Sequence, residues 1–308
     1  LEKVISSGKY DLIADVSTFY HPASAGCKEY VLECVRHYDP SNMYSQEGWF
    51  GILANWGFGY GFIAGPEASM HYKFNTTSGY SYFNPSKSLY DAFVAEEGAD
   101  GYRLNAWIRT WEQVIAMNIA VNTTTNKYAS EGYFRLKWLA STDDEFVGYW
   151  CGNQSNTPVI RYADVLLMAA EACLQAGDQA GADEYLGRVR DRARLPRKSH
   201  VTLSDIKLER RLELAMEGMR FQDLKRWGDA PAVLADKGKK LPTFQIVPDP
   251  NNDLTTAAGI YNARYTTKTT YVDNEKSLAG WTPNRDEWLP FPENELEVNS
   301  NLKQNPGY

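Results

Sequence analysis

The sequence predicts a mainly α-helical protein with irregular and short β segments, because four regions of its 308 residues differ in texture. Residues 158–228 carry strong helical periodicity, which is the primary sequence signal for helices. Residues 38–157 interleave Gly, Asn, Ser, Thr and aromatic residues, a mixture that favours loops over long helices. Residues 229–308 return to turns and short strands, and residues 1–37 contain a helix end and a connector. These boundaries define the expected domain organisation.

Two helices at the start of the helical region are expected to form a hairpin. The first runs from Ile160 to Gly177, is rich in strong helix formers and follows Pro158. The second runs from Ala180 to about Ala193. Small and apolar residues recur near the spacing of a tetratricopeptide repeat, where they let two antiparallel helices approach, and a lone repeat must stack on something else to bury its face. These residues are Ala170, Cys173, Gly177, Ala182, Leu186 and Val189, and the first helix has its packing face at Val165, Ala169, Ala172 and Ala176.

A third helix is expected to begin near Thr202–Asp205, a segment that suits a helix N-cap. It carries an apolar stripe and a row of carboxylates, both at helical spacing. Gly218 interrupts the pattern and predicts a bend or a close backbone approach. The stripe consists of Leu208, Leu212, Ala215 and Met219, and the row consists of Glu209, Glu213 and Glu217.

The carboxylate row is compatible with two roles. Glycosidases need a pair of carboxyl groups about 5–9 Å apart across a bound sugar, and neighbours on one helix can be that close. Arg210 and Arg220 lie within reach along the same segment, however, and an ion-paired carboxylate stays ionised and makes a poor general acid. We therefore expect a structural network of salt bridges. Its further members, bridging the helices, are Arg161, Asp164, Glu171 and Arg190.

The first residues, Leu1–Ser7, look like the end of an amphipathic helix that Gly8 terminates. A chain that begins inside an element is expected to have an upstream segment. Neither a signal peptide nor a lipid-attachment motif can be read here, so the N-terminus does not predict a location.

Several classes of function are disfavoured by composition and motifs. A net charge of −7 argues against a basic face that binds nucleic acid or an anionic membrane. No Cys-x-x-Cys pair occurs and the histidines are dispersed, so we expect no metal site. The run Gly57–Gly61 lacks the glycine spacing of a dinucleotide-binding loop, and no nucleophile motif is present. The sequence predicts neither a cofactor nor a catalytic constellation.

Aromatic residues make up 13% of the chain, and many of them cluster between Tyr38 and Phe83 among closely spaced glycines. Glycine at this density favours loops, which lie at the surface and often carry binding function. A flat aromatic ring matches the C–H face of a pyranose, while amide and carboxylate groups can hydrogen-bond its hydroxyl rim. The alternative is that these rings fill a glycine-rich core. The candidate ligand-binding residues are Trp49, Trp56, Tyr60, Tyr72, Tyr80 and Tyr82.

Six motifs occur in the order that is typical of one protein family, and together they resemble the SusD/RagB family of nutrient-binding outer-membrane lipoproteins. They cover roughly residues 158–308, and Leu1–Leu12 resembles the end of the helical repeat that precedes them in the family. The motifs are Arg161–Ala172, Val189–Ala193, Glu209–Arg220, Asp223–Trp227, Leu289–Leu296 and Gln304–Tyr308.

The resemblance implies tetratricopeptide-like helix pairs with a less regular ligand-binding part packed against them. It also implies a lipid-anchored protein on the surface of the outer membrane, which works with a SusC-like TonB-dependent transporter to capture a glycan or other nutrient. Family ligand contacts fall partly between the last helical repeat and the motif that begins at Arg161. Measured against that pattern, the N-terminal portion, with its lipid-bearing Cys and most of the helix pairs, is missing.

We therefore expect a non-enzymatic, SusD-like protein that binds glycan by ring stacking and a few hydrogen bonds. One alternative keeps the fold but replaces the sugar with a peptide, as in RagB-like members. Another is an interaction module whose aromatic face packs on the transporter without binding ligand. A third is a glycoside hydrolase, which would release reducing sugar from a polysaccharide.

Overall fold

The computed structural model describes residues 1–35, 84–116, 127–128, 130–137, 156–253, 255–256, 264–274 and 279–308. The chain divides into two compact units. One comprises Leu1–Met216 with Thr243–Thr270, and the other comprises Glu217–Pro242 with Tyr271–Tyr308. None of the helices in these ranges has the length and apolar character needed to cross a bilayer.

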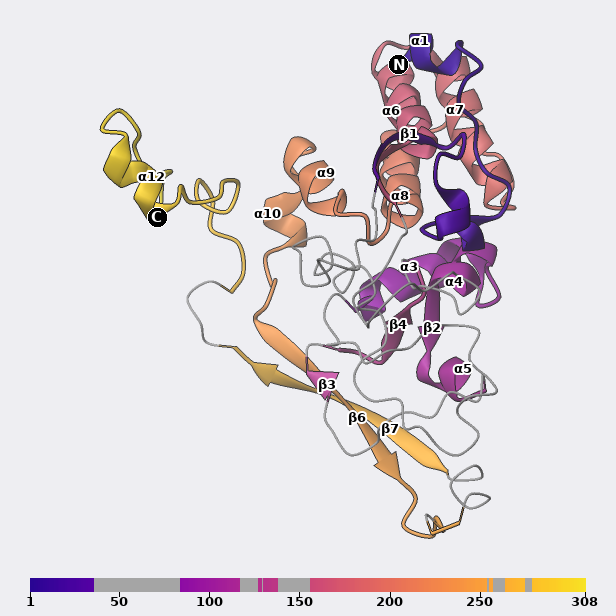
Figure 1. Cartoon of the computed structure of the whole chain (residues 1–308), viewed down its shortest axis with the longest axis vertical. Coiled ribbons are helices and arrows are strands. Elements are labelled where there is room, and N and C mark those ends of the chain that lie inside the picture. Colours follow the sequence, from indigo (N-terminus) through magenta and orange to yellow (C-terminus); the bar gives the residue numbers. More distant parts are fainter. Residues whose placement is uncertain are drawn as a thin grey trace, which may run out of the picture. The chain divides into compact units, whose positions relative to one another are not determined.

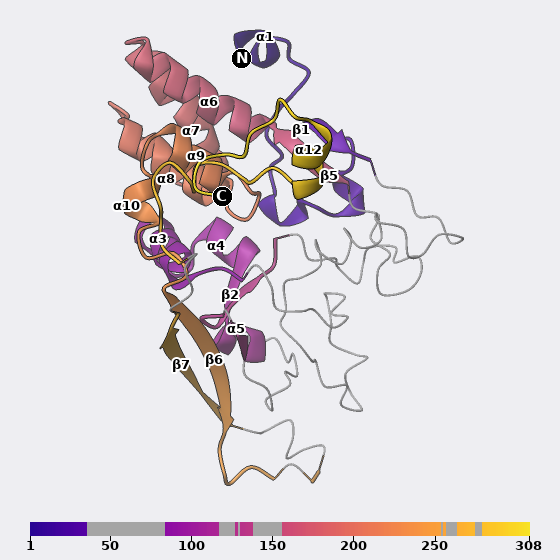
Figure 2. The same cartoon turned by 90° about the vertical axis from the view of Figure 1, so that its left-hand side faces the viewer.

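The predicted helical hairpin is present in the first unit. It consists of α6 (Tyr162–Gln175) and α7 (Gln179–Arg192), which lie side by side, as Figure 1 shows. Gly177 turns the chain with φ 80°, a left-handed conformation that glycine adopts without steric cost. The Asp178 carboxylate then caps α7 by accepting a hydrogen bond from the Gly181 amide at 2.9 Å. Helix α8 (Leu203–Glu213) packs against both, as the second view shows (Figure 2).

The first helix begins two residues later than expected, because Ile160 and Arg161 belong to a strand. Strand β5 (Thr157–Arg161) pairs antiparallel with β1 (Tyr30–Cys34). The predicted packing face is confirmed in its first half only: Val165 and Ala169 are buried, whereas Ala172 and Ala176 are exposed. The N-terminal half of α6 is buried on several sides, and its C-terminal half extends beyond the core.

The third helix is shorter than its sequence pattern predicts. It begins with a capping box between Thr202 and Asp205 and ends at Glu213. Met216 and Gly218 then take positive φ angles of 64° and 82°, and a separate helix, α9 (Arg220–Arg226), follows. The expectation that three carboxylates form one row along a single helix was therefore wrong at Glu217, which lies in the turn between α8 and α9.

Buried cations supply the physical reason for this early end. The Lys137 amino group donates to the carbonyl oxygens of Glu213 and Ala215 at 3.1 and 3.0 Å. Arg161 also donates to the Glu213 carbonyl, at 3.1 Å. The last carbonyls of a helix lack partners within the helix, and positive groups stabilise that end. Helix α8 can therefore end inside the core with its last carbonyl, that of Glu213, hydrogen-bonded.

Short helices also occur within the segment expected to be irregular. They are α3 (Lys87–Glu97), α4 (Tyr102–Trp107) and α5 (Trp111–Ala116), and strand β2 (Ile108–Thr110), which joins the last two, pairs with β4 (Tyr133–Arg135). The N-terminal residues form α1 (Glu2–Ile5) and two 3-10 turns, η1 (Val16–Thr18) and η2 (Pro22–Ser24). The predicted helix end before Gly8 is thus confirmed.

A core cluster of aromatic and aliphatic side chains packs the N-terminal segment, α3 and α4 together with Leu212 of α8. Trp107 is 1% exposed, contacts Phe93 edge-on at a centroid distance of 6.3 Å, and donates from its indole nitrogen to the Val16 carbonyl at 3.1 Å. Phe19 packs on the same tryptophan, with centroids 6.4 Å apart. These rings fill the core at the point where the N-terminal segment crosses α4.

A three-stranded sheet has the order β3 (Lys127–Tyr128), β6 (Lys240–Pro248) and β7 (Tyr265–Asp273). In the second unit, α9 is followed by α10 (Ala230–Val233), and α12 (Glu293–Val298) lies near the C-terminus. The final residue is tied back to its own unit, because the Tyr308 hydroxyl donates to the Trp288 carbonyl at 3.1 Å.

Leu186 tests the packing of the hairpin. It is fully buried, and truncation to alanine leaves a cavity between α7 and its neighbours. We expect L186A to lower the free energy of unfolding by about 2–5 kcal/mol, measured by urea denaturation. The matched control is L32A, which removes a leucine side chain that is 52% exposed and should cost far less. Equal losses in the two variants would contradict the packing described for α7.

Candidate functional site

The six aromatic residues predicted to bind ligand, Trp49, Trp56, Tyr60, Tyr72, Tyr80 and Tyr82, lie outside the described residues. The structure does describe the frame on which their segment begins and ends. Strand β1 pairs Cys34 with Thr157 of β5, and the Asn156 amide donates to the Glu33 carboxylate at 3.0 Å. The points where the chain enters residues 36–83 and leaves residues 138–155 are therefore held side by side.

The other end of residues 36–83, called the aromatic segment below, is followed by α3. Ser86 caps this helix, and the Lys87 amide donates to the Glu131 carboxylate at 2.5 Å. One turn later Tyr90 stacks on Tyr133 of β4, with centroids 4.5 Å apart. Both ends of residues 36–83 are thus anchored on regular elements of the first unit.

Glu213 is the centre of a buried network of ion pairs. Its carboxylate accepts from Arg161 at 3.0 Å, from Arg103 at 3.1 Å and from Arg192. Burial by itself would raise the pKa of Glu213, but the three arginine charges outweigh burial and hold the pKa far below its ordinary value. Glu29 shares two of these partners, Arg161 at 2.5 Å and Arg192 at 3.1 Å.

A second branch of the network surrounds Glu209. Its carboxylate lies 2.5 Å from Arg103 and 3.1 Å from Arg190. Arg103 also binds Glu97 at 2.7 Å, and Arg190 binds Glu96 at 2.6 Å. For Glu29 and Glu97 burial is the dominant influence and raises the pKa in spite of the neighbouring arginines.

The structural interpretation of the carboxylate row is confirmed for Glu209 and Glu213. Their side chains are 1% and 0% exposed and are fully engaged with arginines, so neither carboxylate faces a space that a substrate could enter. The expected bridging pairs also form at Arg161, at Arg190, and between Arg210 and Asp164 at 2.7 Å. In the described residues, no three His, Cys, Asp or Glu side chains gather to hold a metal ion.

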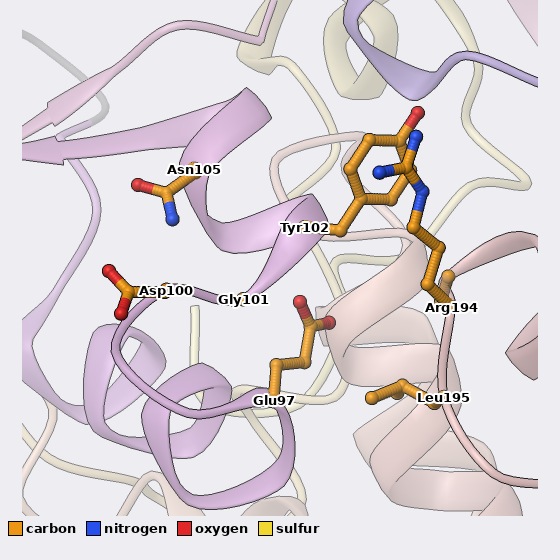
Figure 3. Close-up of a pocket in the computed structure, with 8 residues that line it drawn as sticks. Glu97, Asp100, Gly101, Tyr102, Asn105, Arg194 and Leu195 are labelled. Atoms are coloured by element: carbon orange, nitrogen blue, oxygen red, sulfur yellow. The ribbon is translucent and has the colours of Figure 1, made fainter.

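A pocket of about 410 Å³ lies in the first unit, between the start of α4 and the residues after α7. Figure 3 shows the Asp100 carboxylate and the Asn105 amide on one side of Gly101, and the Arg194 guanidinium lying over the Tyr102 ring on the other. The remaining lining residues are Glu97, Ala193 and Leu195. Sequence patterns carry no signal for this pocket, because Tyr102 and Arg194 come from separate parts of the chain.

Hydrogen bonds and stacking fix the wall of this pocket. The Tyr102 hydroxyl donates to the Asp15 carboxylate at 3.0 Å and accepts from the Val16 amide at 3.2 Å. Burial would raise the pKa of Asp15, but hydrogen bonds from Ser17 and Tyr102, together with the Arg194 charge, lower it below its ordinary value. The Arg194 guanidinium carbon lies 3.7 Å from the centre of the Tyr102 ring.

Replacement of Glu213 by glutamine tests the network. E213Q keeps the shape of the side chain but leaves three buried arginines short of a counter-charge, and breaking a buried ion pair costs about 3–5 kcal/mol. Urea denaturation should show a loss of this size. The control, E112Q, changes an exposed glutamate and should alter stability by less than about 0.5 kcal/mol. A loss below about 1 kcal/mol in E213Q would contradict the role assigned to the network.

The difference in stability between wild type and E213Q should depend on pH. The folded pKa of Glu213 is depressed, so its contribution to stability is present above the unfolded pKa of about 4.5 and is lost as the pH falls below it. The stability gap between wild type and E213Q should therefore be widest near pH 7 and narrow below pH 4.5. Denaturation curves at a series of pH values measure this gap, and a gap that widens in acid would show the opposite sign.

The relatives found by comparison with known proteins all belong to one family. The profile of the SusD family matches residues 28–308. A SusD-like protein of Bacteroides ovatus is 31% identical over 170 residues, which are 49% of this chain and 29% of that protein. The SusD-like protein P38 of Formosa agariphila is 36% identical over 157 residues, 46% of this chain and 28% of that protein.

Solved structures share the fold. A laminarin-binding SusD-like protein is 25% identical with a TM-score of 0.67, over 97% of this chain and 54% of that one. Surface glycan-binding protein A from Bacteroides thetaiotaomicron, solved with laminarihexaose, has a TM-score of 0.69 at 23% identity, over 99% of this chain and 57% of that one.

The chain thus spans just over half the length of these structures and under a third of the curated relatives. The family profile nevertheless covers most of its residues, and the buried ion network uses Arg161, Glu209 and Glu213 from the motifs that carried the resemblance. The chain belongs to the SusD family.

Proposed function

We propose that this protein binds a neutral glycan at the cell surface, with a laminarin-type β-glucan as the first candidate. The observation that carries the proposal is the family match, together with 25% identity to a laminarin-binding SusD-like protein over 97% of the chain. The aromatic content of 13% supplies the rings that such a ligand requires.

The ligand site in this proposal is built from Trp49, Trp56, Tyr60, Tyr72, Tyr80 and Tyr82. We assign ligand binding to residues 38–157, which contain them. Support comes from the described frame, because the ends of residues 36–83 are anchored at β1 and α3. A binding segment anchored at both ends loses less conformational entropy when ligand binds. Sugars exchange water hydrogen bonds for protein ones at small net gain, so binding at one site is weak and reversible.

The whole protein is proposed to act in nutrient uptake. It would be held on the outer membrane by an N-terminal lipid anchor and would pass its ligand to a SusC-like TonB-dependent transporter. Support for this comes from membership of the family. Weak binding suits such a transfer, because the binding protein has to release the glycan to its partner.

Titration calorimetry with laminarihexaose, and with a panel of soluble peptides beside it, tests the proposed function. We expect heat of binding with the oligosaccharide. Replacing Trp49, Trp56 and Tyr60 by alanine should lower the affinity by at least about tenfold, because the stacking of aromatic rings on the sugar is lost. W288A is the matched control, since that tryptophan is 57% exposed and lies outside the proposed site. Heat with peptides alone would favour a RagB-like peptide binder.

Two further outcomes separate the remaining alternatives. If the triple alanine variant binds ligand normally but no longer forms a complex with the transporter, the aromatic segment is an interaction surface. Release of reducing sugar from a polysaccharide would instead show a hydrolase. The first result would contradict the assignment of ligand stacking to these rings, and the second would contradict a function limited to binding.

A further inference from the structure

The pocket between α4 and the end of α7 has the dimensions and open groups of a ligand site. Its volume of about 410 Å³ lies within the range of about 300–1,000 Å³ that is usual for small-molecule pockets. Its floor is the bare backbone of Gly101, where an added Cβ would come within 2.5 Å of the Glu97 side chain. All of its lining residues belong to the described part of the first unit.

The charged groups of the pocket differ in whether they already have partners. The Glu97 carboxylate is neutralised by Arg103 at 2.7 Å and is 1% exposed. Asp100 and Arg194 are exposed, and within the described residues neither side chain forms a hydrogen bond or a salt bridge. The amide nitrogen of Asn105 is also free of a protein acceptor there, because only its oxygen is used, by Arg109 and Gln113. The pocket therefore presents one anion, one cation and one amide donor to solvent.

The backbone at Arg194 adds an independent observation. This residue follows the C-cap of α7 with φ 61°, the left-handed position that glycine usually occupies after a helix. A residue with a Cβ costs about 1–2 kcal/mol in this conformation. Here the position places a guanidinium plane 3.7 Å from the Tyr102 ring, where it forms a flat wall that carries hydrogen-bond donors at its rim.

This combination selects a class of ligand. The two oxygens of a carboxylate can each accept from one hydroxyl of a vicinal diol, and amide and guanidinium nitrogens can donate to hydroxyl oxygens. An anionic ligand would be repelled by the Asp100 carboxylate, and a cationic ligand would be repelled by the Arg194 guanidinium. We propose that this pocket is a second saccharide subsite, which takes a neutral sugar unit through Asp100, Asn105 and Arg194 and uses none of the six candidate aromatic residues. The proposal rests on the glycan-binding function proposed above.

The double variant D100A/R194G tests the subsite in the full chain. Glycine relieves the positive φ at position 194, so the variant should be as stable as the wild type or more so. Calorimetry with laminarihexaose should show two binding sites in the wild type and one in the variant. Affinity for polymeric laminarin should fall by about tenfold or more, because two linked sites reinforce each other on one long ligand.

The control K240A/D273A also removes one cation and one carboxylate, an exposed ion pair between β6 and β7 at 3.8 Å, and should leave stoichiometry and affinity unchanged. One hexasaccharide site in the wild type, or unchanged binding in D100A/R194G, would overturn the second subsite while leaving the proposed function intact. Absence of binding to either glycan in the wild type would overturn the proposed function itself, and the subsite with it.

Discussion

The architecture of the first unit depends on one buried carboxylate that three arginines share. Arg103 reaches Glu213 from α4, Arg161 from the end of β5 and Arg192 from α7. Removing any partner from such a cluster leaves a charge without water or counter-ion, which costs more than a lost contact between apolar groups. The three arginines therefore fix where α4, β5 and α7 lie relative to the end of α8. The packing of Trp107 and Phe19 fills the space beside that frame.

The network also joins parts of the chain that are remote in sequence. Glu29 and Arg161 are 132 positions apart, and Arg103 and Glu213 are 110 apart. Each bond of this kind closes a long loop, and the entropy cost of closure grows only slowly with loop length. Guanidinium groups form hydrogen bonds in a fixed planar geometry, so they specify the relative orientation of the joined elements as well as their proximity. We infer that residues 36–83 and 138–155 are attached to a rigid support at the points where they leave the described structure.

The accuracy of the sequence predictions follows the range of the interactions involved. Helices α6 and α7 could be placed within about two residues because periodicity, Asp178 and Gly177 are local signals. The end of α8 could not be placed, since the cations that satisfy its last carbonyls, Lys137 and Arg161, come from distant segments. The ion-pair partners of the row at Glu209 and Glu213 were expected along the helix, but most of them arrive from other elements.

The two candidate sites also differ in how far the sequence alone could identify them. The aromatic residues between Tyr38 and Phe83 stand out in the sequence because they are close together, and their role in ligand binding is a proposal. The pocket at Tyr102 and Arg194 could not be predicted, because its two walls come from α4 and from the residues after α7, and the positive φ of Arg194 is seen only in the structure. A glycine after α7 would have been the ordinary choice, and its absence becomes informative only when the structure shows a positive φ there.

Burial and ion pairing make Glu209 and Glu213 unsuited to general acid catalysis. A general acid has to exchange protons with a substrate near working pH, which requires access and a pKa that matches the task. Glu209 and Glu213 are sealed among arginines, and the pKa of Glu213 is held far below that range. Internal charges are thus used for rigidity, whereas Asp100 and Arg194 keep their hydrogen-bonding capacity for solvent or ligand. In the proposed function, a rigid frame whose surface groups are free to form hydrogen bonds would capture a glycan and release it unchanged.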